Sequence, residues 1–304
     1  MNEGFQDEET LGLLARTNKD LWESSDRPDE ARKLLQESHD LYRQGYDRAV
    51  ASQSPDGALY SGINAATTAL LLDQRESALR LASDVEQICK RKLDDMSDYW
   101  ALATLGECAL IARRWDDAEH HYSHAARLAG RNFADIASTK RNATMILQRL
   151  GQTSVDLAKW FPMPNIVVFT GHLIDRPDAP RRFAPDQIEK VYDEIKHVLV
   201  DAGAGFGFSA AACGGDLLFL EALDELGGDS HVVLPLPREC FIKASVAVPG
   251  KRYWVADFER LMERASQLTV VNEFSRRAQS EHFEYANVVM TGLAMLQSRA
   301  LGTN

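Results

Sequence analysis

The sequence lacks the features that mark secreted and membrane proteins. Its 304 residues include only four cysteines, with no CxxC pair and no disulfide-framework spacing, so we expect reduced thiols in a cytoplasmic protein. No apolar run approaches the roughly 18 residues that a membrane helix needs. The first ten residues, MNEGFQDEET, are acidic and contain neither the basic nor the apolar region of a signal peptide. We therefore expect no membrane as a partner.

A surplus of positive charge is missing as well. The formal net charge is −11, whereas proteins that bind nucleic acid generally need a basic face to displace counterions. This charge argues against a general nucleic-acid binder and leaves room for a local basic pocket that holds one small anion. We also predict no metal and no cofactor. His120 and His124 would share a helix face beside His121, but no third metal ligand is identifiable, which favours a solvated face.

Proline is almost absent from the first half of the chain. Only Pro55 lies between Pro28 and Pro162, which suits a string of helices because proline breaks a helix interior. Two segments, 40 residues apart, have the spacing of a tetratricopeptide (TPR) repeat, in which small residues lie where two helices touch. They are Ala66, Ala69, Ala78 and Ala82, and then Leu102, Leu105, Gly106, Ala109, Ala118, Tyr122 and Ala125. We predict a TPR-like α-solenoid over residues 1–159, which either binds a protein partner or packs on the second half.

A short phrase supports the same interpretation. Residues Tyr60–Ala66 read YSGINAA and resemble the YxGINAA phrase in the TPR-like TRAF-binding segment of apoptosis-signal-regulating kinases and their bacterial relatives. The resemblance covers roughly residues 25–150 and implies a regulatory, protein-interaction module. No kinase follows, since the chain has neither a glycine-rich loop with its lysine nor the HRD and DFG sequences.

The second half alternates strand-like and helix-like segments after a proline-containing linker at residues 160–164. Short apolar runs are typical of buried parallel strands, and 3.6-residue stripes between them are typical of helices. The strand-like runs lie at 165–170, 205–209, 232–234 and 268–271, and the last helical stripe covers 278–300. This alternation predicts a doubly wound, parallel-sheet Rossmann-like domain over residues 165–304. The predicted fold class is α plus α/β, in two domains.

Four predicted strand ends carry polar groups or glycine. Ligands bind parallel sheets outside the carboxyl ends of the strands, and the fourth end, Asn272-Glu273, adds two polar side chains. Residues 210–215 carry no bulky side chain, so backbone N–H groups of the next helix could approach a phosphate; alternatively, the small residues only let that helix pack closely. Loop arginines would grip phosphate oxygens. The predicted ligand-binding residues are Thr170, Gly171, His172, Arg181, Arg182, Ser209, Cys213, Gly214, Gly215, Asp216 and Pro235.

Three sequences in this half resemble the SLOG superfamily, the Rossmann-like group that includes LOG-type cytokinin-activating enzymes and DprA-like proteins. They are FTGH at 169–172, GFSAAACGGDLLFLEAL at 207–223 and VVLPLPRE at 232–239. In LOG enzymes a PGGxGTxxE motif carries a catalytic glutamate seven residues after its first glycine, and Glu221 has that separation from Gly214. However, Cys213 replaces the proline, Leu217-Leu218 replaces Gly-Thr, and a GGGxxGxM loop is missing. The resemblance implies nucleotide binding more than hydrolysis.

Three functions follow from these patterns. The first is a signalling protein whose sheet domain binds a nucleotide or nucleotide-derived ligand and whose TPR-like domain relays occupancy to a protein partner. The second is an enzyme that cleaves the N-glycosidic bond of a nucleotide, with Glu221 at the ribosyl centre and Asp216 or His172 handling protons. The third is a non-catalytic scaffold. Cys213 could serve as a helix-terminal nucleophile or, without an adjacent base, as a small buried residue.

An apolar face is also predicted on the last helix. Val288, Val289, Leu293 and Leu296 fall on one stripe, which would suit a homo-oligomer contact.

Overall fold

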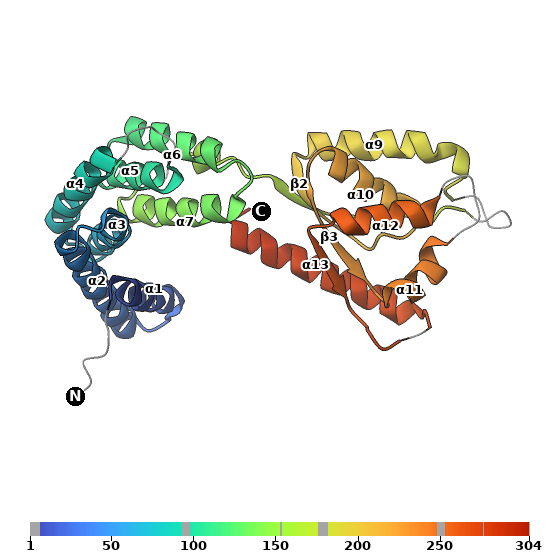
Figure 1. Ribbon diagram of the computed structural model, residues 1–304, viewed down its shortest axis with the longest axis horizontal. Coiled ribbons are helices and arrows are strands. Elements are labelled where there is room, and N and C mark those ends of the chain that lie inside the picture. Colours follow the sequence, from blue (N-terminus) through green and yellow to red (C-terminus); the bar gives the residue numbers. More distant parts are fainter. Residues whose placement is uncertain are drawn as a thin grey trace. The chain divides into compact units, whose positions relative to one another are not determined.

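The computed structural model describes residues 7–92, 98–152, 154–175, 182–247, 253–275 and 277–303. The chain divides into two compact units at Pro162/Met163, one helical and one built on a parallel sheet (Figure 1). The predicted fold class, a helical repeat array followed by a parallel sheet with helices, is confirmed. None of the helices in the described segments is both long and apolar enough to cross a membrane.

The helical unit is an array of packed helices, and the connections between α1 and α4 and between α5 and α7 are short. Pro28 and Pro55 stand at the first positions of their helices, where a missing N–H costs no hydrogen bond. Its elements are α1 (Glu8–Ser24), α2 (Pro28–Ala51), α3 (Pro55–Leu71), α4 (Arg75–Lys92), α5 (Tyr99–Ile111), α6 (Trp115–Ala129), α7 (Phe133–Arg149) and α8 (Leu157–Trp160).

The turns of this array repeat at the predicted spacing. Asp73 ends the α3–α4 turn with φ 68° and Arg113, 40 residues later, ends the α5–α6 turn with φ 59°. Each turn is closed by the next amide, which donates to a carbonyl five residues back (2.9 Å from Gln74 to Ala69 and 2.8 Å from Arg114 to Ala109). Gly106 lies where α5 and α6 touch, since a Cβ there would come within 2.7 Å of the Tyr122 ring.

The left-handed backbone at Arg113 leads to a first prediction. This conformation costs an L residue with a side chain about 1–2 kcal/mol, whereas glycine adopts it freely. Glycine also loses more conformational entropy on folding, which offsets part of the stability that the substitution gains. Arg113→Gly should therefore raise the free energy of unfolding of the helical unit by about 0.5–1 kcal/mol in urea titrations. Arg113→Ala, which shortens the side chain without relieving the backbone, is the control. An equal gain in both variants would show that the side chain, not the turn, is responsible.

The second unit contains one four-stranded parallel sheet in the order β1-β2-β3-β4. The strands are β1 (Asn165–Val168), β2 (Ala204–Ser209), β3 (Asp229–Leu234) and β4 (Gln267–Val270). The longer helices are α9 (Ile188–Asp201), α10 (Gly215–Glu225), α12 (Trp254–Arg264) and α13 (Ser280–Leu301), with short turns at Pro185–Gln187, α11 (Arg238–Phe241) and Ile242–Val246.

Helices cover both faces of this sheet. Right-handed crossovers place α9, α10 and α12 on one face, where Leu217, Phe219 and Phe258 belong to a single buried core. The last helix, α13, packs on the other face against Phe208 and Val233 (Figure 1). The order of the described strands never reverses, so their carboxyl ends form one row and not the crevice of a sheet whose order switches.

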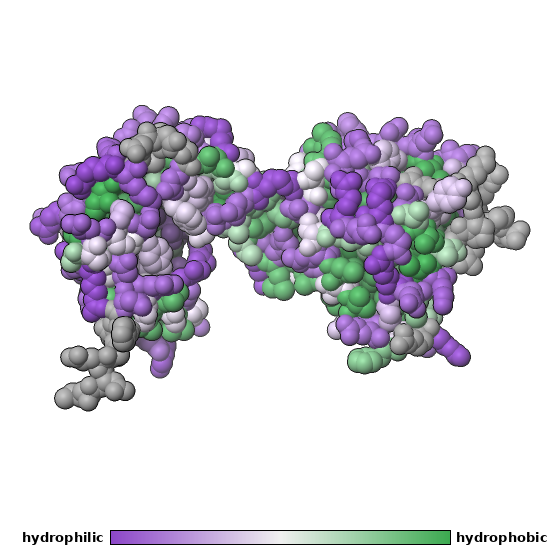
Figure 2. Space-filling model, viewed as in Figure 1, coloured by the Kyte–Doolittle hydropathy of each residue, from purple (hydrophilic) through white to green (hydrophobic). Residues whose placement is uncertain are grey.

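The apolar residues of α13 divide between its two sides. Val289 and Leu293 pack against the sheet, because they face Phe208 and Val233. Val288 and Leu296 are exposed by 67% and 61%. Figure 2 shows apolar surface in the region of α13. The predicted oligomer face therefore loses two of its four residues to the core of the unit.

Candidate functional site

The loop after β1 packs directly on the N-terminus of α10. Leu173 pairs with Gly214 in an isolated antiparallel bridge, and the Gly215 N–H donates to the His172 carbonyl over 3.0 Å. A Cβ on Gly171 would lie 2.6 Å from the Gly215 Cα. The small residues of this turn thus allow two backbone segments to touch. Thr170 and His172, on the same loop, are exposed.

Asp216 ties this loop to the turn before α10. Its carboxylate accepts hydrogen bonds from the Gly171 N–H (2.7 Å) and the Ala212 N–H (3.2 Å), and the residue is only 6% exposed. Burial raises the pKa of Asp216 to about 6, and the two N–H donors offset part of that rise. Several N–H groups near this helix terminus already have partners within the protein, so a phosphate placed here would compete with them.

The other predicted residues of this region are spread over several environments. Cys213 is fully buried and its N–H donates to the Ser245 carbonyl over 2.9 Å, which matches its interpretation as a small packed residue. Ser209 is also fully buried, and its hydroxyl has no hydrogen-bond partner among the described residues. Arg182 is exposed, and its backbone N–H donates a hydrogen bond to the Asp175 carboxylate over 2.9 Å. Arg181 lies outside the described residues.

Glu221 lies on the side of α10 that faces α12. Its carboxylate pairs with Arg260 over 3.0 Å, and Arg260 also contacts Asp257. Glu221 does not line the cavity described next. The residue proposed for hydrolysis is therefore held in an ion pair between two helices.

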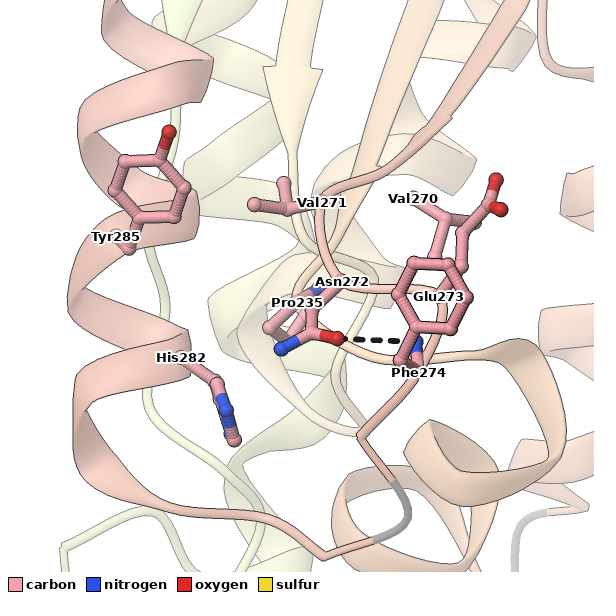
Figure 3. Close-up of a pocket in the computed structure, with 8 residues that line it drawn as sticks. All are labelled: Pro235, Val270, Val271, Asn272, Glu273, Phe274, His282 and Tyr285. Atoms are coloured by element: carbon pink, nitrogen blue, oxygen red, sulfur yellow. Dashed lines mark hydrogen bonds between the residues drawn. The ribbon is translucent and has the colours of Figure 1, made fainter.

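A cavity of about 440 Å³ lies at the carboxyl ends of β3 and β4. Figure 3 shows that its walls come from the loops after these strands and from the first turns of α13. Of the predicted ligand-binding residues that the structure describes, only Pro235 lines it. The polar strand end Asn272-Glu273, noted from the sequence, also lines it. The described residues that line it are Pro235, Val270, Val271, Asn272, Glu273, Phe274, His282 and Tyr285.

Asn272 fixes the shape of the loop after β4. Its Oδ1 accepts hydrogen bonds from the Phe274 N–H (3.0 Å) and the Ser275 N–H (2.9 Å). Among the described residues its side-chain nitrogen has no hydrogen-bond acceptor, so both amide hydrogens can serve as donors, and in Figure 3 that nitrogen lies on the side of His282. Asn272 therefore combines a structural bond with the ability to donate to a ligand.

Three aromatic rings surround this polar end. Phe274 is 90% exposed and Tyr285 is 60% exposed, which is unusual for rings that bury well. His282 belongs to the first turn of α13, and its Nδ1 is shielded from solvent without a hydrogen-bond partner among the described residues. Sequence patterns missed these three residues, because α13 meets the β4 loop only in the folded chain. The one available signal was a phenylalanine directly after a polar strand end.

The cavity combines features that suit a flat, anionic ligand. Exposed rings offer stacking surfaces, Asn272 offers donors, and the exposed Glu273 carboxylate offers an acceptor. The N-terminus of the 22-residue α13 borders the cavity, and the positive end of a helix dipole favours negative charge there. In the part of the chain that the structure describes, no cluster of three His, Cys, Asp or Glu side chains could hold a metal ion.

A comparison with protein families supports the TPR-like character of the N-terminal segment. A family model described as Tetratricopeptide Repeats-Sensor matches residues 1–71, which span α1 to α3. The match agrees with the predicted TPR-like segment and covers less than a quarter of the chain. No curated protein matches the sequence.

Proposed function

We propose that the protein is a regulatory ligand-binding protein. Its sheet unit, which we propose to be SLOG-like, binds a nucleotide or nucleotide-derived molecule at the carboxyl edge, and its TPR-like unit binds a protein partner. The observation that carries the proposal is the cavity at β3 and β4, where Phe274 of the loop after β4 lies near His282 and Tyr285 in the first turns of α13. Its size falls within the range of about 300–1,000 Å³ that is typical of small-molecule sites.

Each part of a nucleotide has a matching group in this cavity. A base would stack on Phe274 or Tyr285, and ribose hydroxyls would donate to Glu273. The Asn272 amide and the N-terminal turn of α13 would hold the phosphate. His282 Nδ1, which has no partner among the described residues, would gain one from the ligand.

The neighbouring strand ends extend the proposed site for larger ligands. The four strands lie side by side in sequence order, so the ends of β4 and β1 are three strand spacings apart, about 14 Å. A dinucleotide with one base at Phe274 would bring its other end near Thr170 and His172. These two residues, with the arginines of the same loop, remain proposed contacts of such a ligand. A mononucleotide would not reach them.

Ligand binding can regulate a partner only if two states of the protein differ in affinity for the ligand. The loops that line the cavity can make contacts with the ligand in one state of the protein and not in the other. The TPR-like array supplies the surface that a protein partner would read, as stacked helix pairs commonly do. Hydrolysis is disfavoured by the Glu221–Arg260 ion pair, since a catalytic carboxylate must reach the reacting carbon.

Native mass spectrometry tests the proposal. The purified protein is mixed with AMP, cyclic AMP, NAD, ADP-ribose and cyclic dinucleotides. We expect one intact ligand bound per chain for at least one compound. Release of free base and ribose phosphate, abolished by Glu221→Gln, would make the protein a hydrolase instead. No binding by any compound would contradict the proposal.

A further inference from the structure

The helical unit contains a cavity of its own, independent of the carboxyl edge of the sheet. It has a volume of about 520 Å³ and is lined by residues of α1, α3, α5 and α7, with contributions from α2 and α4. Stacked helix pairs usually leave an open groove on their inner side. Here two buried charged residues lie at one end of that space.

These two residues are Lys19 on α1 and Glu107 on α5, each 6% exposed. The Lys19 ammonium donates to the Asn142 side-chain oxygen over 3.0 Å, and Thr67 donates its hydroxyl hydrogen to Glu107. Because Asn142 belongs to α7, the first of these bonds connects helices that lie 123 residues apart in the chain. The bond links α1 to α7 in the wall of the cavity, whose volume suits a small molecule.

Charged groups are seldom buried without a reason. Burial lowers the pKa of Lys19 and raises the pKa of Glu107, so both charges are held against their solvation preference. Apolar residues of similar size often give equal or higher stability than buried charged groups. These two residues are therefore poorly explained by stability, and better explained by a polar ligand that they contact.

Lys19 has acidic and basic neighbours, and among the basic ones Arg141 is the second cation for a negative ligand. Arg16, one turn before Lys19 on α1, pairs with Asp20 over 4.0 Å, whereas Arg141 precedes Asn142 on α7; both arginines line the cavity. Burial has the largest effect on the pKa of Lys19 and lowers it, whereas nearby acidic groups raise it. The charge of Arg141 lowers this pKa further. An anion between these cations would relieve their mutual repulsion. At another part of the lining, Lys92 is paired with both Asp56 and Asp98, so that part offers no comparable site.

Aromatic rings provide the remaining wall. Trp100 is 55% exposed and Tyr60 is 45% exposed, although both line the cavity. The Tyr60 ring packs edge-on against Tyr42, with ring centroids 6.0 Å apart, which fixes its orientation. Leu59 and Ile63 add apolar surface. A flat ring inserted here would bury aromatic area that water now covers.

We propose that this cavity binds a small, flat organic anion, whose acid group bonds to Lys19 and whose ring lies against Trp100. The site is separate from the proposed nucleotide site, and either one can exist without the other. It would make the helical unit a second ligand-responsive element, because an anion between α1 and α7 strengthens the link between the two helices.

The probes are 2-naphthoate and 2-naphthamide, which differ mainly in charge. Isothermal titration calorimetry is performed in a Phe274→Ala background, so that the sheet unit contributes less to binding. We expect the naphthoate to bind about tenfold more tightly than the amide, or better. This difference corresponds to one charge-assisted hydrogen bond between its carboxylate and Lys19. Lys19→Met should reduce this preference to less than about twofold. Lys33→Met, whose side chain is 77% exposed on α2, is the matched control and should keep the preference.

A preference that survives Lys19→Met would overturn the proposal, as would equal binding of the two probes. Circular dichroism checks whether Lys19→Met still folds. If it does not, Trp100→Ala serves in its place, since this half-exposed side chain is not required by the core. Trp100→Ala should weaken naphthoate binding about tenfold, in keeping with the loss of one stacking surface. Unchanged affinity in that variant would equally overturn the proposal.

Discussion

Gly214→Ala is expected to lower the free energy of unfolding of the sheet unit by about 3 kcal/mol, the sum of two costs. Gly214 has φ +104°, a conformation that disfavours any side chain, and its Cβ would lie 2.6 Å from both the His172 oxygen and the Ile174 nitrogen. Both neighbours are backbone atoms, so they cannot turn away. The variant must separate the loop after β1 from α10. Urea unfolding followed by circular dichroism measures the change.

Gly292→Ala is the matched control. Gly292 lies inside α13, and apart from the backbone of α13 and the two neighbouring residues no described heavy atom lies within 4 Å of the position where its Cβ would be. Alanine favours a helix interior over glycine by about 1 kcal/mol, so this variant should be slightly more stable than the wild-type protein. If both variants changed stability by the same small amount, the contact between the β1 loop and the α10 turn would be refuted.

Asp216→Asn should change how the stability of the sheet unit depends on pH. Burial raises the pKa of Asp216 from 3.8 to about 6 in the folded protein. The folded state therefore holds this proton more tightly than the unfolded state, and the contribution of Asp216 to stability is full below pH 4 and lost as the pH rises to about 6. A shift of about two pKa units corresponds to about 3 kcal/mol. Asparagine carries no such proton and loses nothing over this range.

The measurement is the free energy of unfolding of both proteins from pH 4 to pH 7. Groups other than Asp216 titrate in both proteins, so only the difference between the two curves is compared. We expect the wild-type protein to lose about 2.4 kcal/mol relative to Asp216→Asn between these limits, because the unfolded carboxyl is already partly ionised at pH 4. Parallel curves would mean that the Asp216 carboxyl titrates as it does in the unfolded chain. They would contradict its buried position between Gly171 and Ala212.

Local patterns were sufficient to predict the elements of the fold. The apolar run Val232–Leu234 became part of the central strand β3, and the helix that begins after Pro185 ends just before Gly203. The TPR spacing predicted small residues where two helices touch, and Gly106 is such a residue, since a Cβ there would come within 2.7 Å of the Tyr122 ring. Such signals lie within a few residues of each other, so periodicity and turn chemistry reveal them.

The contacts that build the sites could not be predicted in the same way. Asp216 accepts from Gly171, 45 residues away, and Lys19 reaches Asn142 across 123 residues. Likewise, the cavity forms because α13 brings His282 and Tyr285 against the loop after β4. These contacts depend on which elements meet in space. No spacing in the sequence specifies that meeting.

We propose that the cavity at β3 and β4 is the nucleotide site. The most direct test is a calorimetric titration of the wild-type protein, Phe274→Ala and Tyr253→Ala with whichever nucleotide of the mass-spectrometry panel binds. Both aromatic side chains are exposed, Phe274 by 90% and Tyr253 by 84%, but only Phe274 lines the cavity. We predict that Phe274→Ala weakens binding about tenfold, as expected for one lost stacking partner, and that Tyr253→Ala leaves it unchanged. Equal affinity in all three proteins would contradict the account.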